Sequence, residues 1–188
     1  MDRRTILTGF VAVGAAPIIL AQTRPVLAAT PMAAMPVTSF ADVKTAAQFY
    51  STVIGRAEIS LATSQVASEK ATQKNSLEFA GFELGEAITV NMVLKDTGAM
   101  GPGMDADAHG MVEKVVSAGK GKAFDKAYIG LQLENHEYLR DLADAFVHNS
   151  TGVTDHAEVQ GRHLSMLMLA VFKEHVAICK RITKELDA

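Results

Sequence analysis

The feature that most constrains this chain is the spacing of its apolar residues, which recur every three or four positions over most of its length. This spacing is typical of amphipathic helices, whereas a half-buried strand would alternate at every second position. Four long stretches show it, at about residues 40–71, 72–96, 122–149 and 154–188, and a shorter stretch covers about 105–118. The sequence therefore predicts an all-α fold, a four-helix bundle.

Residues that favour turns separate these stretches. Asp105 is expected to cap the short helix, and residues 119–121 (GKG) are expected to end it. Residues 149–152 (NSTG) are expected to close the third long helix, so that the last one begins at Thr154 or Asp155. No internal repeat or second domain is apparent, and residues 40–188 read as a single helical domain.

In a helical projection, each long helix places one polar residue among apolar neighbours. These residues are Glu58, Glu83, Asn135 and His175. Several polar or ionisable groups that point into one core are costly unless they are paired or coordinate a metal. Ferritin-like bundles build their metal sites from inward carboxylates and histidines in this way. The pattern predicts either a metal centre or a set of hydrogen-bonded structural groups.

Two further residues lie close to this inward face. Glu86 is near its edge on the second helix, and His136 flanks Asn135 on the third, so that a small rotation decides which of those two reaches the core. The candidate metal ligands are therefore Glu58, Glu83, Glu86, His136 and His175. Carboxylate and imidazole ligands suit iron, manganese or zinc. The Glu-x-x-His pair of di-iron bundles does not occur in the appropriate helices.

The connection at residues 97–121 is long enough to cross the length of the bundle. If both short turns lay at the same end, Glu83 and His175 would be about 20 Å apart along the axis. If the connection crosses instead, four of the candidate ligands lie within about 10 Å of one level, namely Glu58, Glu83, His136 and His175. We therefore expect a ferritin-like bundle in which the crossover contains the short helix.

The N-terminus is typical of a secretory signal. Arg3 and Arg4 precede an apolar stretch from Ile6 to Ala21 and small residues near Ala28, so residues 1–28 are expected to be cleaved. The run from Arg3 to Leu7 also resembles the twin-arginine export motif, and both export routes remain open. Residues 29–39 are expected to be a disordered leader. The protein is therefore expected in the periplasm or outside the cell, with no stable membrane insertion after cleavage.

The composition excludes several classes of function. The net charge is −3, and the basic residues are scattered, so nothing favours binding to nucleic acid. The single Cys179 excludes an internal disulfide and any metal site built on several cysteines. One alternative site lies in the connection, where Met100, Met104, His109 and Met111 offer the soft ligands that suit Cu(I). The other interpretation is that these methionines fill gaps in the packing.

Three segments resemble the secreted, ferritin-like family known as the domain of unknown function 4142. The closest is the run Phe124-Asp125-Lys126-Ala127-Tyr128 followed by His136-Glu137. The run Gly55-Arg56-Ala57-Glu58, then Phe79-Ala80 with the acidic Glu86, resembles the first half of the family, and Glu174-His175 resembles its last helix more loosely. The chain departs from the family at Glu86-Ala87, where an Asp-His pair is usual, and at Ala170, where a proline is usual.

The resemblance covers about residues 40–182 and implies the fold more firmly than an activity, since the family has no settled reaction. The expected function is an exported ferritin-like protein of undefined activity with a metal in the bundle core. Two alternatives remain open. One is a non-enzymatic envelope or stress-related structural protein without metal, and the other is a periplasmic copper-binding protein that uses the methionine and histidine connection.

Overall fold

The computed structural model describes residues 39–188, which fold entirely as helices and their connections. The elements are η1 (Phe40–Asp42), α1 (Ala46–Lys70), α2 (Lys74–Asp96), α3 (Ala106–Val116), α4 (Lys122–Asn149) and α5 (His156–Asp187). No strand occurs in this part of the chain, so the predicted all-α bundle is confirmed. The expected signal peptide, residues 1–28, and all of the expected leader except Ser39 lie outside the described residues.

Most helix ends follow the local signals in the sequence. Asp105 and Asp155 accept hydrogen bonds from backbone N–H groups in the first turns of α3 and α5, as N-cap residues do. Gly121 and Gly152 have φ values of +67° and +83°, a backbone conformation that glycine adopts without strain. The start of α4 at Lys122 and its end at Asn149 are as predicted.

The first predicted helix, about 40–71, begins later than expected. A single 3-10 turn comes first, and the Thr45 side chain then caps α1 through a capping box with Gln48. The second helix begins at Lys74 rather than at Thr72. The reason is that the backbone N–H groups of Thr72 and Gln73 donate to the Asp125 carboxylate on α4, which holds these residues in the turn.

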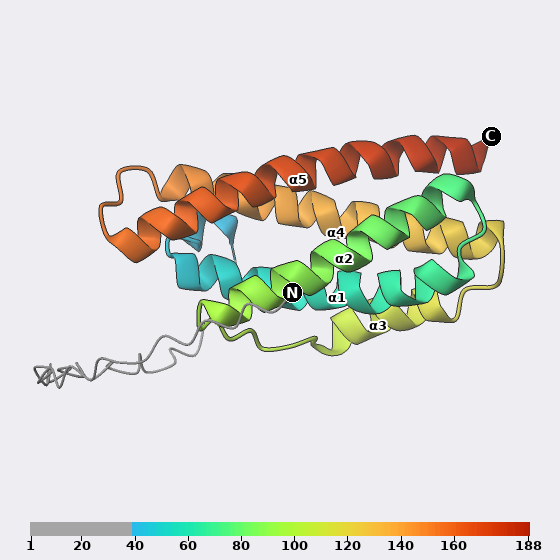
Figure 1. Cartoon of the computed structure of the whole chain (residues 1–188), viewed down its shortest axis with the longest axis horizontal. Helices are drawn as coiled ribbons and strands as arrows, with labels where there is room; N and C mark the ends of the chain where they lie inside the picture. Colours follow the sequence, from blue (N-terminus) through green and yellow to red (C-terminus); the bar gives the residue numbers. More distant parts are fainter. Residues whose placement is uncertain (1–38) are drawn as a thin grey trace, which may run out of the picture. The chain divides into compact units, whose positions relative to one another are not determined.

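The long helices form two hairpins, α1 with α2 and α4 with α5, as Figure 1 shows. The hairpins meet chiefly where α1 packs on α4. The connection from α2 to α4 runs alongside α1. It lies against Ile54 at Gly101, and near its other end the Val116 carbonyl accepts a hydrogen bond from Lys70. The short helix α3 therefore covers a side of α1 that faces away from α2 (Figure 1).

The core consists of two hydrophobic clusters. One surrounds Phe49 and Phe146, whose rings stack with centroids 5.0 Å apart, and the other surrounds Phe79, Phe124 and Tyr128. Along α2, α4 and α5, a few buried polar residues fall in the stretch between these clusters. The fold thus places a thin polar layer between two apolar halves.

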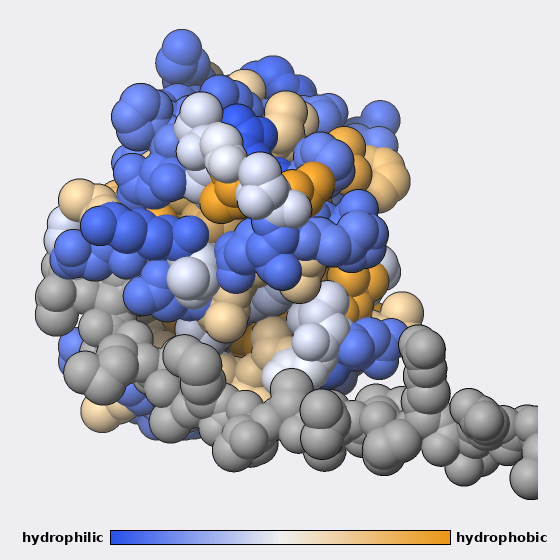
Figure 2. All heavy atoms as spheres, turned by 90° about the vertical axis from the view of Figure 1, so that its left-hand side faces the viewer, coloured by the Kyte–Doolittle hydropathy of each residue, from blue (hydrophilic) through white to orange (hydrophobic). Residues whose placement is uncertain are grey.

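The face of the molecule that Figure 2 shows is mainly hydrophilic. Figure 2 views the end of the bundle that carries the α4–α5 turn, where hydrophilic side chains predominate and smaller hydrophobic patches lie between them. Within residues 39–188, no helix has the length and apolar character needed to cross a membrane.

Candidate metal centre

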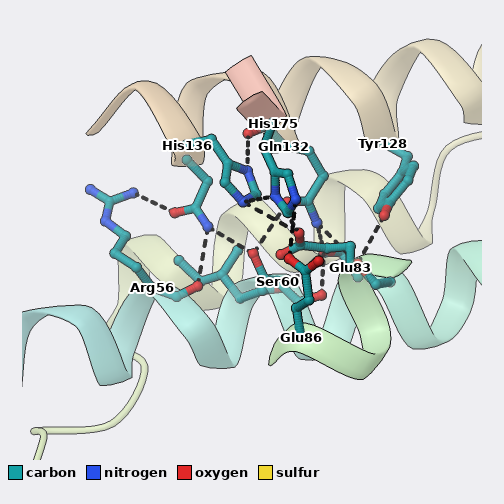
Figure 3. Close-up of polar contacts among 12 residues, drawn as sticks. Arg56, Ser60, Glu83, Glu86, Tyr128, Gln132, His136 and His175 are labelled. Carbon is teal, nitrogen blue, oxygen red and sulfur yellow. Dashed lines mark hydrogen bonds and ion pairs between the residues drawn. The ribbon is translucent and has the colours of Figure 1, made fainter. Parts of the chain in front are cut away.

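Three ionisable side chains from three helices meet in the polar layer. Glu83 on α2, His136 on α4 and His175 on α5 are each at most 6% exposed, and they face one another in Figure 3. His136 Nε2 lies 3.0 Å from His175 Nδ1 and 3.3 Å from Glu83 Oε2. His175 Nδ1 lies 3.0 Å from the same carboxylate oxygen. Burying three such groups together is costly unless a cation or a proton neutralises them.

The outer nitrogen of each imidazole has an acceptor, and the acceptor beside His136 fixes the position of that ring's proton. His136 Nδ1 lies 2.8 Å from the Gln132 carbonyl, which can only accept, so this nitrogen carries the hydrogen. His175 Nε2 lies 3.0 Å from Glu86 Oε2, which also accepts. When His175 carries its hydrogen on Nε2, toward Glu86, the inner nitrogens of both rings present lone pairs to each other and to Glu83.

Glu83 adds a third set of lone pairs at the same point. Its Oε2 is buried and accepts no hydrogen bond of good geometry, although both inner nitrogens lie within 3.3 Å. Three acceptors this close repel one another unless a positive charge lies among them. An extra proton or a metal ion would relieve this repulsion.

The spacing of the three atoms suits a metal ion. Two ligands about 2.1 Å from one ion, at angles of about 90–110°, are separated by about 3.0–3.4 Å. The three separations here, 3.0, 3.0 and 3.3 Å, fall in this range. Two histidines and one carboxylate on one face of an ion leave its other positions open. Glu86 and the Gln132 carbonyl supply the outer hydrogen bonds that metal-bound histidines ordinarily make.

Without a metal, the same contacts retain a proton on His175. Burial lowers the pKa of this imidazole, but the Glu83 and Glu86 carboxylates, each 3.0 Å from one of its nitrogens, outweigh burial and raise the pKa to about 9. Burial raises the pKa of Glu83, yet the nearby His136 and His175 imidazoles outweigh burial and lower this pKa to about 2. The centre therefore attracts positive charge, which either a proton or a metal ion can supply.

Aromatic and apolar groups surround the centre. The edge of the Phe79 ring meets both imidazoles, with centroids 5.3 Å from His175 and 6.3 Å from His136, and Phe172 packs against His136 from α5. Cys179, one turn beyond His175, is fully buried, and burial together with the Glu83 charge raises the pKa of its thiol far above the ordinary value. These neighbours pack against the rings and hold them in place.

Asn135 belongs to a separate hydrogen-bonded network. Its side-chain amide donates to the Arg56 carbonyl and to the Ser60 hydroxyl on α1. The neighbouring Gln132 amide donates to Thr63 and Ser64 on the same helix, as Figure 3 shows in part. The sequence left open whether Asn135 or His136 reaches the core. Both are buried, with Asn135 directed to α1 and His136 to α2 and α5.

Glu58 does not join the other candidate ligands. The residues that come together are Glu83, His136 and His175, with Glu86 on the outer nitrogen of His175. Glu58 is half-buried, and its carboxylate lies near Gly103 of the connection. Glu58 was predicted to point into the core because it lies among apolar residues of α1. The connection covers a second side of this helix, so α1 has apolar residues on more than one side and they do not mark the core alone.

The residues of the alternative methionine and histidine group differ in burial. Met104 and Met111 pack against the core cluster around Phe124, whereas Met100 and His109 are exposed. The packing interpretation of Met104 and Met111 therefore agrees with the structure.

One contributor to the centre has no obvious sequence signal. Gln132 acts through its backbone carbonyl, which orients His136 one helical turn later, and any residue four positions before the histidine offers that group. The side-chain amide of Gln132 meanwhile ties α4 to α1. The contacts of this residue emerge only from the packed helices.

Comparisons of the chain with models of protein families, with curated proteins and with solved structures find no match.

Proposed function

We propose that this chain is an exported ferritin-like helical-bundle protein that binds one divalent metal ion, iron, manganese or zinc. Glu83 Oε2, His136 Nε2 and His175 Nδ1 are the ligands, and Glu86 orients His175 from the outer side. The observation that carries this proposal is the convergence of three buried potential ligand atoms, with an acceptor at the outer nitrogen of each imidazole. When bound, the ion supplies a Lewis acid, or a redox centre if it is iron or manganese.

The ferritin-like part of the proposal is supported by the order of the helices. A long connection between α2 and α4 that runs along α1 is the arrangement of ferritin-like bundles, and it brings ligands from three helices to one level. The residues that resemble the domain of unknown function 4142 include His136 and His175 of the centre and Asp125, which binds the α1–α2 turn from α4. Within residues 39–188, one three-residue group could hold a metal ion, which differs from the larger ligand set of ferritin-like di-iron proteins.

Elemental analysis of the natively exported protein tests the proposal. We expect about one iron, manganese or zinc per chain in the wild type, and loss of most of this metal in His175→Ala and Glu83→Gln. His163→Ala is the matched control, because His163 is an exposed histidine on the same helix as His175 and should retain the metal.

The competing function is an envelope protein whose buried polar groups only stabilise the bundle. A metal-free wild type that gains no thermal stability from added iron, manganese or zinc would contradict the metal centre and favour this alternative.

A further inference from the structure

The polar centre forms one wall of a cavity of about 520 Å³ between α2 and α5. This volume is within the range of small-molecule sites, about 300–1,000 Å³. The cavity exists because α2 pairs with α1 and α5 pairs with α4, while α2 and α5 themselves make little contact. Its lining is mainly apolar, including Val90, Val171 and Phe172.

The polar groups of the cavity are concentrated where the metal centre lies. Glu83, Glu86, His136 and His175 all contribute to the lining. A small number of polar groups at one point of an apolar cavity fixes the orientation of a bound molecule. The shape therefore suits a molecule with an apolar body and one polar group.

The charges at the centre restrict that polar group. The carboxylates of Glu83 and Glu86 together balance the two positive charges of a divalent ion. An anionic head group would add an uncompensated negative charge to a largely buried site, whereas a neutral oxygen donor would not. A hydrocarbon without an oxygen would leave the open metal position unused.

We propose that the cavity binds a small, neutral, largely apolar molecule through one hydroxyl oxygen, an alcohol or a phenol, which coordinates the metal ion. Such a molecule enters between Phe82 on α2 and Leu167 on α5, two large apolar side chains that line the cavity and are 63% and 69% exposed. This assignment of the ligand rests on the proposed metal-binding function.

Three probes share one apolar body and differ only in the polar group, so they separate the effects of a hydroxyl, of no polar group and of a carboxylate. They are 2-naphthol, naphthalene and 2-naphthoate. Their fluorescence can be titrated with the metal-loaded protein without interference, because the chain contains no tryptophan. We expect one 2-naphthol per chain, bound at least about tenfold more tightly than either of the other probes. Removal of the metal with a chelator should abolish this preference.

Two variants locate the binding. Val90→Phe/Val171→Phe adds bulk to the cavity from both helices and should weaken 2-naphthol binding by about tenfold or more. Val116→Phe is the control, since Val116 is as exposed as Val171, at 38%, but lies on α3 away from the cavity, and it should bind normally. Metal content and thermal unfolding of each variant show whether the fold and the centre are intact.

The outcomes separate the two proposals. Equal affinity for 2-naphthol and naphthalene in a protein that retains its metal would overturn the ligand assignment alone. A wild type without metal would overturn the proposed function instead. A dimer that dissociates in Val90→Phe/Val171→Phe, together with no binding of any probe, would show that the cavity is an interface between two copies and would also overturn the assignment.

Discussion

Asp125 stabilises the α1–α2 turn from a buried position on α4. Its carboxylate accepts hydrogen bonds from the backbone N–H groups of Thr72 and Gln73 and from the Thr72 hydroxyl. Three residues later, the Tyr128 hydroxyl shares a 2.8 Å hydrogen bond with Ser64 on α1. The Phe-Asp-x-x-Tyr run that resembles a known family therefore joins the two hairpins, independently of any metal.

We predict that Asp125→Ala lowers the free energy of unfolding by about 2–4 kcal/mol, because three donors lose a buried, charged acceptor. Urea denaturation measures this change. Asp144→Ala is the control on the same helix, since the Asp144 side chain is exposed and makes only a 3.8 Å ion pair with Lys173. Equal effects of the two substitutions would contradict a special role for Asp125.

The stability of the metal-free protein should depend on pH through His175. Its pKa is raised from 6.5 to about 9, so the stabilisation is complete below about pH 6.5 and is lost as the pH rises through 9. A shift of this size corresponds to about 3 kcal/mol. Urea midpoints measured from pH 6 to pH 10 should fall in the wild type and remain nearly flat in His175→Gln. A midpoint that increases over this range would refute the prediction.

At the residue scale, the sequence predicted part of the centre. Glu83 and His175 were identified because each is a polar residue in the middle of an apolar helical stripe. His136 and Asn135 are neighbours separated by about 100° around α4, and a projection cannot show which partner helix each of them faces. Glu58 was misassigned because the connection, whose path depends on tertiary packing, covers an additional side of α1.

At the scale of elements, the approach of α5 to α1 depends on Gly161. A Cβ atom at this position would collide with Ala46 Cβ and lie 3.2 Å from the Tyr50 hydroxyl. One turn earlier, Glu158 accepts a hydrogen bond from the Ala46 backbone N–H, so the first turn of α5 also satisfies the first turn of α1. The close contact and this hydrogen bond therefore depend on each other.

Gly161→Ala should destabilise the protein by about 1–3 kcal/mol, because the added methyl group separates α1 from α5. The matched control is Gly130→Ala in α4, where a Cβ atom meets nothing within 4 Å. Alanine is the better helix former, so this control should stabilise the protein by about 0.5–1 kcal/mol. Chemical denaturation of both variants gives the comparison, and the prediction fails if the two changes have the same sign.

Helices themselves were more predictable than their arrangement. Local signals mark the starts of α3 and α5 and both ends of α4. The signals are the capping residues Asp105 and Asp155 and the positive-φ residues Gly121 and Gly152, and each acts only on the backbone next to it. The first two long helices were predicted too long at their N-termini. In α2 the difference comes from Asp125, a residue distant in sequence whose influence no local pattern reveals.

At the scale of the whole molecule, the centre connects two hairpins that otherwise meet mainly through α1 and α4. Glu83 belongs to the first hairpin, whereas His136 and His175 belong to the second. An ion that binds all three therefore stabilises the association of the hairpins as well as the local geometry, because it binds the folded state and not the separated one.

The buried Cys179 makes the opening of the bundle measurable in real time. It is the only cysteine, it is fully buried near the centre, and its environment disfavours the reactive thiolate. A thiol reagent in excess should therefore modify the native protein only when the hairpins separate. If modification is fast, the rate of labelling equals the rate of this opening, and if it is slow, the rate of labelling is proportional to the population of the open state. Added iron, manganese or zinc should slow labelling at least about tenfold in the wild type and leave His175→Ala unchanged. Labelling as fast as that of a free thiol, with or without metal, would show that the thiol is accessible in the native state.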